Sequence, residues 1–287
     1  MPELPEIEIV KRSLYKMINK AKITSITINN KNLRYKIASN FSQSLKGEKI
    51  IKITRRSKYL IFFLKTKLIL IHLGMTGKLL IIRNRDNATF RTSFYYNLNI
   101  ISKHNHIIFK LNNGLMLIYN DVRRFGFLKI YKISEINKIS FLKKLGLEPL
   151  NDKFNIKYFK KFSLKRKKNI KNLIMDQTFI CGLGNIYANE ALFMSKIKPF
   201  RECNNLNDFE IKNLILSIKR VLKLSISKGG SSIRDFISSS GKSGQFQQFF
   251  QVYGRKNKSC SRALCKGIIK KINISNRSSF YCNICQS

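Results

Sequence analysis

The chain of 287 residues has no long apolar run and few acidic residues. Its most apolar stretch, residues 60–73, is interrupted by Lys65 and Lys67, so it predicts neither a signal peptide nor a transmembrane helix. Only 15 Asp and Glu oppose 56 Lys and Arg, which gives a formal net charge of +41. This excess favours a polyanionic partner, first of all nucleic acid. Because the lysines are spread along the whole chain and have AT-rich codons, the alternative explanation is drift in an AT-rich genome, which would supply much of the lysine without a function.

Cysteines are scarce as well, and four of the six crowd the C-terminal end. Cys260 and Cys265 are followed by sixteen residues and then by Cys282 and Cys285. Two thiolate pairs separated by a hairpin-sized insert are typical of a structural, tetrahedral Zn²⁺ site. The alternative is four unliganded thiols. The spacing favours one zinc ion in a reducing cytosol over a disulfide framework.

Hydrophobic periodicity predicts an α+β chain. Apolar residues at three- and four-residue steps predict an amphipathic helix over residues 5–20. Short Ile-, Leu- and aromatic-rich runs then predict a β-sandwich or flattened barrel over residues 22–132, in strands at 23–28, 50–54, 59–64, 68–73, 78–82, 107–111, 115–119 and 125–131. Helical spacing follows, with helices expected at 186–194 and 207–228. Residues 231–244 are rich in Ser and Gly, which indicates either a lid or a connecting loop.

The first six residues, Met1-Pro2-Glu3-Leu4-Pro5-Glu6, form a compact set of groups for covalent catalysis. If Met1 is removed, Pro2 provides a secondary amine that can attack an electron-poor carbon and form an iminium adduct. Glu3 and Glu6 can then donate and accept protons. The structural alternative is that Pro5 begins a helix whose first turn favours acidic residues.

Three further motifs have weaker signals on their own. Gly182-Leu183-Gly184-Asn185 precedes a helix and suits a phosphate clamp or an ordinary helix cap. Lys58 lies in a basic run beside a strand, a setting that usually points to solvent. His104 and His106 suit a phosphate contact or a surface strand better than a metal site, because no further ligand is evident beside them.

Taken in order, the motifs resemble those of the bacterial formamidopyrimidine-DNA glycosylases of the Fpg/Nei family over the whole chain. The resemblance is carried by Met1-Pro2-Glu3-Leu4-Pro5-Glu6, Arg56-Ser57-Lys58-Tyr59-Leu60, His72-Leu73-Gly74-Met75-Thr76-Gly77, Asp121-Val122-Arg123-Arg124-Phe125-Gly126, Gly184-Asn185-Ile186-Tyr187-Ala188, Gln251-Val252-Tyr253-Gly254-Arg255 and the cysteine finger. It implies an N-terminal catalytic β-sandwich domain with an N-terminal helix (1–134), a helical helix-two-turns-helix domain (135–255) and a zinc finger (256–287).

The resemblance also implies a bifunctional DNA glycosylase and AP lyase of base excision repair, which removes oxidised purines (8-oxoguanine, formamidopyrimidines) and cleaves the strand by β,δ-elimination. A nucleotide must leave the stack for this reaction. The implied catalytic residues are Pro2, Glu3, Glu6, Lys58 and Arg277, and the implied DNA-binding residues are Met75, His104, Arg123, Phe125, Arg166, Asn185 and Tyr253. We expect a cytoplasmic monomer that acts on double-stranded DNA with oxidised bases and on no membrane.

Four departures from the family pattern are visible. The first cysteine knuckle is two residues longer, Val122 replaces a proline, Asn105 an aspartate and Arg166 a lysine. Three rival functions stay open: an endonuclease VIII type enzyme for oxidised pyrimidines, a non-catalytic zinc-ribbon nucleic-acid binder, and a ribosomal or structural protein. Leu4 and the set Met75, Arg123 and Phe125 favour the purine-lesion branch.

Overall fold

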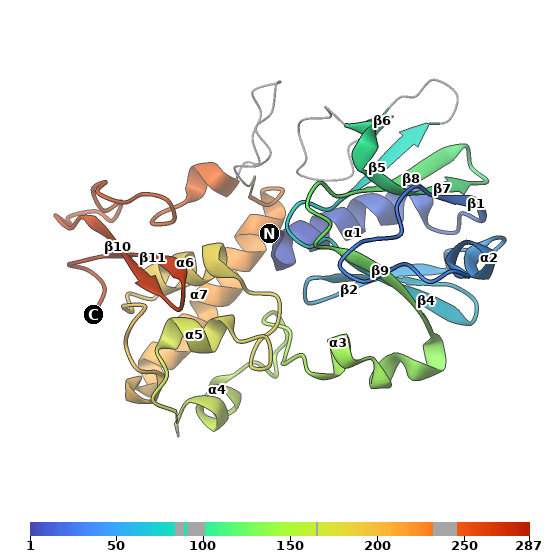
Figure 1. Cartoon of the computed structure of the whole chain (residues 1–287). Coiled ribbons are helices and arrows are strands. Elements are labelled where there is room, and N and C mark those ends of the chain that lie inside the picture. The colour runs from blue at the N-terminus through green and yellow to red at the C-terminus, as the bar shows by residue number, and fades with distance from the viewer. Residues whose placement is uncertain (84–88, 91–100, 165, 232–245) are drawn as a thin grey trace. The chain divides into compact units, whose positions relative to one another are not determined.

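The computed structural model describes residues 1–83, 89–90, 101–164, 166–231 and 246–287 (Figure 1). The chain forms two compact units. The first is Met1–Lys143 with Lys228–Gln247, and the second is Lys144–Ser227 with Gln248–Ser287. The expected functional division at residues 134 and 255 stays a prediction. The expected loop at 231–244 lies outside the described residues, apart from Ser231.

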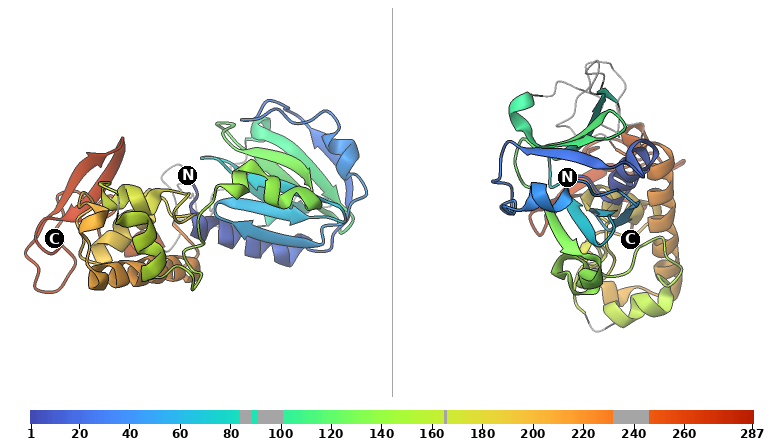
Figure 2. Two further views of the ribbon diagram at one scale, coloured as in Figure 1. Left: turned by 90° about the horizontal axis from the view of Figure 1, so that it is seen from below. Right: turned by 90° about the vertical axis from the view of Figure 1, so that its right-hand side faces the viewer.

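The first unit contains the predicted β-sandwich (Figures 1 and 2). One antiparallel sheet has the order β1-β7-β8-β5-β6, with β1 (Ile23–Ile28), β7 (Asn105–Leu111), β8 (Leu115–Asn120), β5 (Lys78–Arg83) and β6 (Thr89–Phe90). The other has the order β2-β3-β4-β9, with β2 (Lys52–Arg56), β3 (Tyr59–Phe63), β4 (Lys67–His72) and β9 (Phe127–Lys132). The predicted strands are confirmed with ends shifted by one or two residues, and β6 was not predicted.

Helix α1 (Leu4–Ile18) supplies one side of the sandwich core. Its buried face carries Ile7, Val10, Leu14 and Ile18, at the spacing of the predicted helix. The helix begins at Leu4, one residue before the predicted start, because Glu3 adopts an extended N-cap conformation. Each fully buried aliphatic side chain of this kind contributes roughly 1.5–3 kcal/mol to the hydrophobic term.

Short elements complete the first unit. Helix α2 (Phe41–Leu45) packs beside β1, and η1 (Ser102–His104) precedes β7. The segments η2 (Ile133–Lys138) and α3 (Ser140–Lys143) follow β9 and cover the outer face of the four-stranded sheet. There the rings of Phe127 and Phe141 lie 4.9 Å apart between centroids.

The second unit is helical and ends in a hairpin. Its elements are α4 (Ile156–Ser163), α5 (Ile170–Met175), α6 (Asn185–Met194), η3 (Cys203–Asn205), α7 (Asp208–Ser227), β10 (Ile269–Ile274) and β11 (Arg277–Cys282), with η5 (Phe246–Phe249) at the boundary of the units. Helix α6 is buried almost all round, so it forms the centre of this unit. No helix in the described ranges is long and apolar enough to cross a membrane.

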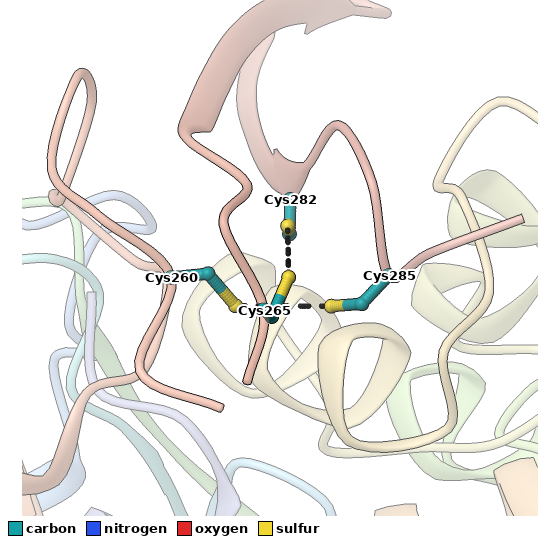
Figure 3. Close-up of side chains that lie close together, drawn as sticks. All are labelled: Cys260, Cys265, Cys282 and Cys285. Carbon is teal, nitrogen blue, oxygen red and sulfur yellow. Dashed lines mark hydrogen bonds between the residues drawn. The ribbon is translucent and has the colours of Figure 1, made fainter. Parts of the chain in front are cut away.

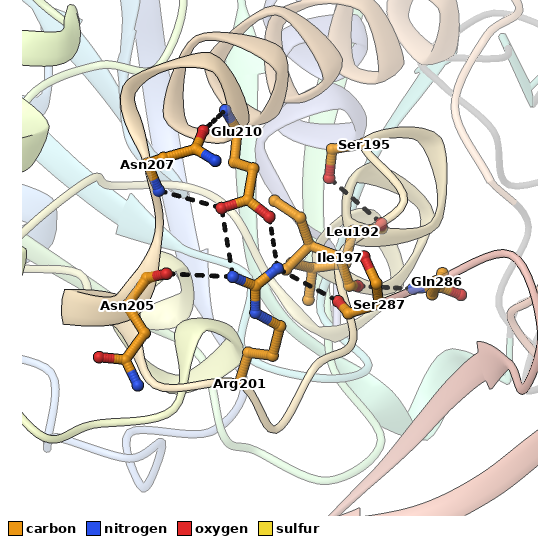
Figure 4. A network of polar contacts seen from close by, with 9 residues as sticks. All are labelled: Leu192, Ser195, Ile197, Arg201, Asn205, Asn207, Glu210, Gln286 and Ser287. Atoms are coloured by element: carbon orange, nitrogen blue, oxygen red, sulfur yellow. Dashed lines mark hydrogen bonds and ion pairs between the residues drawn. The ribbon is translucent and has the colours of Figure 1, made fainter.

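A polar network joins the end of the chain to this helical unit (Figure 4). The Arg201 guanidinium makes a two-point ion pair with Glu210 and donates to the Ser287 carbonyl at 3.4 Å. Gln286 donates to the Ile197 carbonyl and accepts the backbone N–H of Cys282. The second cysteine pair is therefore tied to the helices by residues that follow it.

Candidate active site and metal centre

The N-terminal turn is held by the carboxylate of Glu6. Its Oε2 accepts the Glu3 backbone N–H at 2.9 Å, as in a capping box. Its Oε1 accepts both the N–H and the hydroxyl of Ser231, at 2.9 and 3.0 Å. All three residues are buried, and so is Pro2. Glu6 therefore fixes the peptide that follows Pro2 against the segment that follows α7.

Gly230 makes this close approach possible. Its φ is +81°, and a Cβ there would lie 3.1 Å from Ile9 Cδ1 and 3.2 Å from the Glu6 carboxylate. A side chain at this position would be strained in the left-handed region and would press on the Glu6 contact. Gly230, the second of the two glycines that follow α7, thus has a positional reason beyond helix termination.

Lys58 is buried, with 7% of its surface exposed, so the expectation that its basic run points to solvent is wrong at this residue. An ion-pair chain from α1 holds the turn that carries this lysine. Glu8 accepts hydrogen bonds from Lys11, Arg12 and Arg55, and Arg55 also donates to the Ser57 carbonyl at 3.0 Å. Burial raises the pKa of Glu8, but the Lys11 and Arg55 hydrogen bonds outweigh it and lower the pKa. The β2–β3 turn that carries Lys58 is thereby fastened to the N-terminal helix.

His72, at the end of β4, is held as a neutral ring. Burial, together with the positive charges of Lys58 and Arg34, lowers the pKa of His72 to about 4. Its Nδ1 accepts the Gly74 backbone N–H at 3.0 Å, which requires the unprotonated nitrogen. His72 therefore positions the first residues of the loop 73–77.

Asp121 joins that loop to the loop 121–126. It is fully buried and accepts hydrogen bonds from the Thr76 hydroxyl, the Tyr119 hydroxyl and the Gly126 N–H. The Arg123 N–H in turn donates to the Thr76 hydroxyl at 3.0 Å. The two loops that carry the predicted residues Met75, Arg123 and Phe125 thus form one hydrogen-bonded structure.

The tips of these loops reach solvent. Phe125 is 45% exposed, and the Arg123 guanidinium carbon lies 4.5 Å from the centre of its ring. Val122, which stands where the family pattern has a proline, is exposed as well, so this departure alters no buried side chain. An exposed aromatic side chain beside a cation suits contact with unpaired bases.

The two neighbouring histidines have different surroundings. His106 is buried, and its Nε2 lies 2.7 Å from the Asp121 carbonyl, so it is not the surface residue that one reading of the sequence expected. His104 is half-exposed and available to a ligand. Asn105 accepts the Asn120 side-chain amide at 2.8 Å and therefore has a structural role.

In the second unit the β10–β11 hairpin is anchored on α5 and α6. Asn185 and Lys171 both donate to the Ser278 carbonyl at 3.0 Å, and Asn189 accepts the Phe280 N–H at 2.7 Å. The hairpin turn presents Arg277 to solvent at the start of β11. Asn185, a predicted DNA-binding residue, is the first residue of α6, and Gly184 is the N-cap of that helix. Arg166, also predicted to bind DNA, is exposed.

Two buried charged residues were missed by the sequence analysis. Lys171 is 1% exposed and also donates to the Ser279 hydroxyl at 2.7 Å. Glu190 accepts the N–H groups of residues 251, 252 and 253, and so holds the segment that carries Tyr253. Both lie at core-facing positions of a helix. A single charged residue within an otherwise apolar helical pattern is the feature of the sequence that would have indicated a buried charge.

The four C-terminal cysteines converge (Figure 3). All four sulfur atoms lie within 4.8 Å of one another, and the pairs Cys260–Cys285 and Cys265–Cys282 are 3.7 Å apart. Four thiolates at about 2.3 Å from one tetrahedral ion lie about 3.8 Å from one another, so this set fits Zn²⁺. Burial raises the pKa of Cys282, but the backbone N–H groups of residues 285 and 284 outweigh it and lower the pKa to about 7, which favours the ligating thiolate. Within the described ranges no other His, Cys, Asp and Glu group suits a metal.

The longer first knuckle still reaches the metal site. Its extra residues turn outwards, with Leu264 fully exposed at φ 63°. Arg262 donates to the carbonyls of Phe193 and Met194, the last residues of α6, where a cation is favourable. A Cβ at Gly267 would lie 2.4 Å from the Cys282 sulfur, so the close packing of the cluster requires glycine there.

A β-sandwich with an N-terminal Pro-Glu helix, joined to a helical unit with a four-cysteine hairpin, defines a class of DNA-repair glycosylases. Residues 1–128 match the model of the formamidopyrimidine-DNA glycosylase N-terminal domain, and residues 145–237 match that of the formamidopyrimidine-DNA glycosylase H2TH domain. The chain belongs to the formamidopyrimidine-DNA glycosylase family.

Individual relatives match over the full length. The formamidopyrimidine-DNA glycosylases of Wolbachia pipientis and Rickettsia conorii are 38% and 40% identical, covering 100% of this chain and 100% and 99% of theirs. The Lactococcus lactis Fpg bound to abasic-site DNA has a TM-score of 0.85 at 35% identity, with 99% of each chain covered. A point mutant of the same protein, in complex with DNA that contains Fapy-dG, matches equally well, at a TM-score of 0.85 with each chain fully covered. The predicted family, α+β fold class and enzyme class are confirmed.

Proposed function

We propose that this chain excises oxidised purines, 8-oxoguanine and formamidopyrimidines, from double-stranded DNA and then cleaves the strand at the abasic site. The observation that carries the proposal is the buried Pro2-Glu3 pair, which the Glu6 carboxylate holds in place and the Glu8–Arg55 chain fastens to the turn of Lys58. Solved relatives bound to abasic-site and Fapy-dG DNA support the substrate class.

The chemistry begins with removal of Met1, which exposes the Pro2 amine. Its lone pair forms a bond to C1′ of the extruded nucleotide, while the bonding electrons of the glycosidic bond leave with the base. The Pro2 nitrogen then loses its proton, and Glu3 protonates the sugar ring oxygen as the ring opens to an iminium ion. Loss of the C2′ proton expels the 3′ phosphate, and a second elimination expels the 5′ phosphate. We assign Lys58 to the first elimination and Arg277 to the second.

The geometry supports a positioning role for Glu6 in this reaction. Both of its oxygens accept hydrogen bonds, from Glu3 and from Ser231, so the carboxylate orients the nucleophile's peptide. Glu3 is then the proton donor of the pair. This division agrees with the general pattern in which neighbouring carboxylates take different roles according to their surroundings.

DNA binding is assigned to both units. Met75, Arg123 and Phe125 fill the space that the extruded nucleotide leaves, and the backbone contacts are assigned to His104, Arg166, Asn185 and Tyr253. One structural zinc ion in the cysteine cluster keeps the hairpin and Arg277 in position. We propose three functional parts, at residues 1–134, 135–255 and 256–287, acting as a monomer in the cytoplasm.

Borohydride trapping tests the proposal. With a duplex that contains 8-oxoguanine, the wild type is expected to give a covalent adduct, because borohydride reduces the iminium to a stable amine. Pro2→Gly is expected to lose nearly all of this adduct, whereas Pro5→Ala, which changes the neighbouring helix-start proline, keeps it.

Two results would contradict the mechanism: an undiminished adduct in Pro2→Gly, or mass spectrometry that shows Met1 still attached to active enzyme. A duplex with thymine glycol separates the oxidised-pyrimidine alternative, which predicts faster excision from that substrate. A purely binding protein gives no adduct with either duplex.

A further inference from the structure

The β10–β11 hairpin carries Arg277 directly after its turn. Ile274 and Arg277 are the last pair of the ladder, so the turn consists of two residues, Ser275 and Asn276. Both have positive φ, 47° and 59°, as this type of tight hairpin turn requires. Neither is glycine, the residue that adopts this conformation without strain. Apart from an exposed bond from the Asn172 amide to the Ser275 hydroxyl, the turn depends on the strand that follows it to hold Arg277 in place.

Strand β11 is an edge strand of its two-stranded sheet and lies against α6 (Figure 1). In an antiparallel ladder, alternate residues direct their N–H and C=O groups away from the partner strand. In β11 these are residues 278, 280 and 282, and one backbone group at each of them bonds to side chains from outside the hairpin. The bonds join the Ser278 carbonyl to Asn185 and Lys171, the Phe280 N–H to Asn189, and the Cys282 N–H to Gln286.

Asn189 supplies the middle bond of this edge. Its side chain is fully buried, and its Oδ1 accepts the Phe280 N–H at 2.7 Å. Its Nδ2 donates to the Asn185 carbonyl at 2.6 Å. An N–H group requires an oxygen and a carbonyl requires an N–H group, so these two partners fix the orientation of the amide. One side chain therefore joins the first turn of α6 to the backbone of β11, three residues after Arg277.

The Phe280 bond has no substitute, unlike its neighbour. The Ser278 carbonyl accepts from two donors, Asn185 and Lys171, so either of them can hold it alone. Within the ranges that the structure describes, Asn189 is the one acceptor of the Phe280 N–H. Phe280 is 8% exposed, and a buried N–H that loses its acceptor is unfavourable. Loss of the Asn189 amide would therefore shift the backbone of β11 at this point.

The rest of the hairpin has an anchor of its own. The Phe280 ring packs in a hydrophobic cluster with Phe193, Val252, Ile269 and Cys282, at the end of the hairpin that carries the cysteines. This cluster does not depend on the Asn189 amide. A change at Asn189 is therefore expected to loosen the end of the hairpin that carries Arg277 and to leave the cysteine end in place.

We propose that Asn189 is a positioning residue for the second elimination, because its bond to the Phe280 N–H holds Arg277 at the phosphate that leaves in that step. The inference rests on the role proposed above for Arg277. In this step water takes the C4′ proton, its bonding electrons form the C4′=C5′ double bond, and the C5′–O bond breaks to release the phosphate. The guanidinium binds the departing phosphate through parallel N–H donors, a geometry that tolerates little displacement.

The step can be measured separately from those before it. A duplex whose 5′-labelled strand contains an abasic site is cleaved by excess full-length enzyme, and a denaturing gel resolves two products. The first elimination leaves the labelled fragment with an unsaturated aldehyde, and the second leaves it with a phosphate. Asn189→Ala is expected to lower the ratio of the second rate constant to the first about tenfold, because the Phe280 N–H loses its acceptor. The first rate constant is expected to change less than about twofold, because that step does not use Arg277.

Two further variants serve as rescue and control. Asn189→Asp keeps an oxygen for the Phe280 N–H and is expected to restore most of the ratio. Asn213→Ala, the same type of change on α7 in the same unit, is expected to leave the ratio unchanged. Zinc content and the thermal unfolding curve show that each variant is folded.

Arg277→Ala in the same assay separates the two hypotheses. It is expected to stop the reaction after the first elimination, and adding Asn189→Ala to it is expected to change the ratio no further, because both changes act through one guanidinium. If Arg277→Ala keeps the second elimination, the role assigned to Arg277 is wrong and this inference falls with it. If Arg277→Ala loses that step while Asn189→Ala keeps it, only the inference is overturned. Equal slowing of both eliminations by Asn189→Ala would show a purely structural role and would also overturn it.

Discussion

At the scale of single residues, His72 links the sandwich to the loop that carries Met75. Its ring packs against the rings of Tyr59 and Phe127, with centroid separations of 5.0 and 5.7 Å. These contacts and the bond from Gly74 all suit the neutral imidazole. Protonation would place a buried positive charge beside Lys58 and Arg34, the two cations that already lower the pKa of this histidine.

We therefore predict an acid-sensitive fold. The pKa of His72 is about 4 in the folded chain and 6.5 in the unfolded chain, so the unfolded state binds more protons between these values. Stability is complete above about pH 6.5 and falls as the pH decreases, by about 2 kcal/mol at pH 5. Urea unfolding at about pH 7, 6 and 5 measures this loss.

His72→Asn is the control for this prediction. Asparagine keeps an acceptor for the Gly74 N–H and does not titrate, so the variant is expected to lose less stability than the wild type between about pH 7 and pH 5. Parallel pH profiles of the two proteins would rule out His72 as the cause.

Lys58 shows why some of the site could not be predicted from local pattern. Its neighbours Arg55, Arg56 and Ser57 are polar, and such a run usually lies in water. The turn that carries Lys58 is fastened to α1 by the ion pair of Arg55 with Glu8, 47 residues earlier, which no local window contains. Only the family motif marked Lys58 in advance, and its catalytic role stays a prediction.

At the scale of elements, periodicity predicted α1, α6, α7 and most strands, because each buries one regular face or lies wholly in a core. It missed short elements such as β6, η2 and α3, whose conformation depends on the surface that they cover. Strand order and register were also beyond the pattern. The edge position of β9 follows from its pairing with β4 alone, a fact of topology.

The cysteine hairpin is the element whose order we expect to depend on a bound metal ion. We predict that Cys282→Ser, or zinc removal by a chelator, abolishes amide protection in β10 and β11 and weakens DNA binding, while β3 and β4 stay protected. Three thiolates do not complete a tetrahedral metal site, so the hairpin loses its order. The sandwich keeps its order because it has its own hydrophobic core. Hydrogen exchange followed by mass spectrometry measures both regions.

Cys181→Ser is the matched control, because Cys181 is a buried cysteine of the same unit outside the cluster. It is expected to leave the protection of β10 and β11 unchanged. If Cys282→Ser reduced protection equally in the sandwich and in the hairpin, the finger would not be a separable element.

At the scale of the whole molecule, the acidic residues are largely occupied within the protein. Glu8, Glu210 and Asp176 are ion-paired, and Glu190 and Asp121 are buried. Many of the few carboxylates in the sequence therefore accept hydrogen bonds or form ion pairs within the protein.

This distribution predicts steeply salt-dependent DNA binding. A protein that neutralises six to ten phosphates loses roughly 10³–10⁵-fold in affinity between about 50 and 200 mM salt, and we expect a loss in this range. Undamaged and 8-oxoguanine duplexes are expected to show the same slope, because phosphate contacts set the slope and contacts to the lesion set the difference in affinity. Anisotropy titrations over a series of KCl concentrations measure this slope.

Arg166→Ala is expected to reduce the slope by about one, because one phosphate contact is lost. Ile51→Ala, which changes an exposed uncharged residue, is the control and is expected to leave the slope unchanged. A flat titration would show that the positive surface is not what binds DNA, and the lysine content would then reflect codon composition.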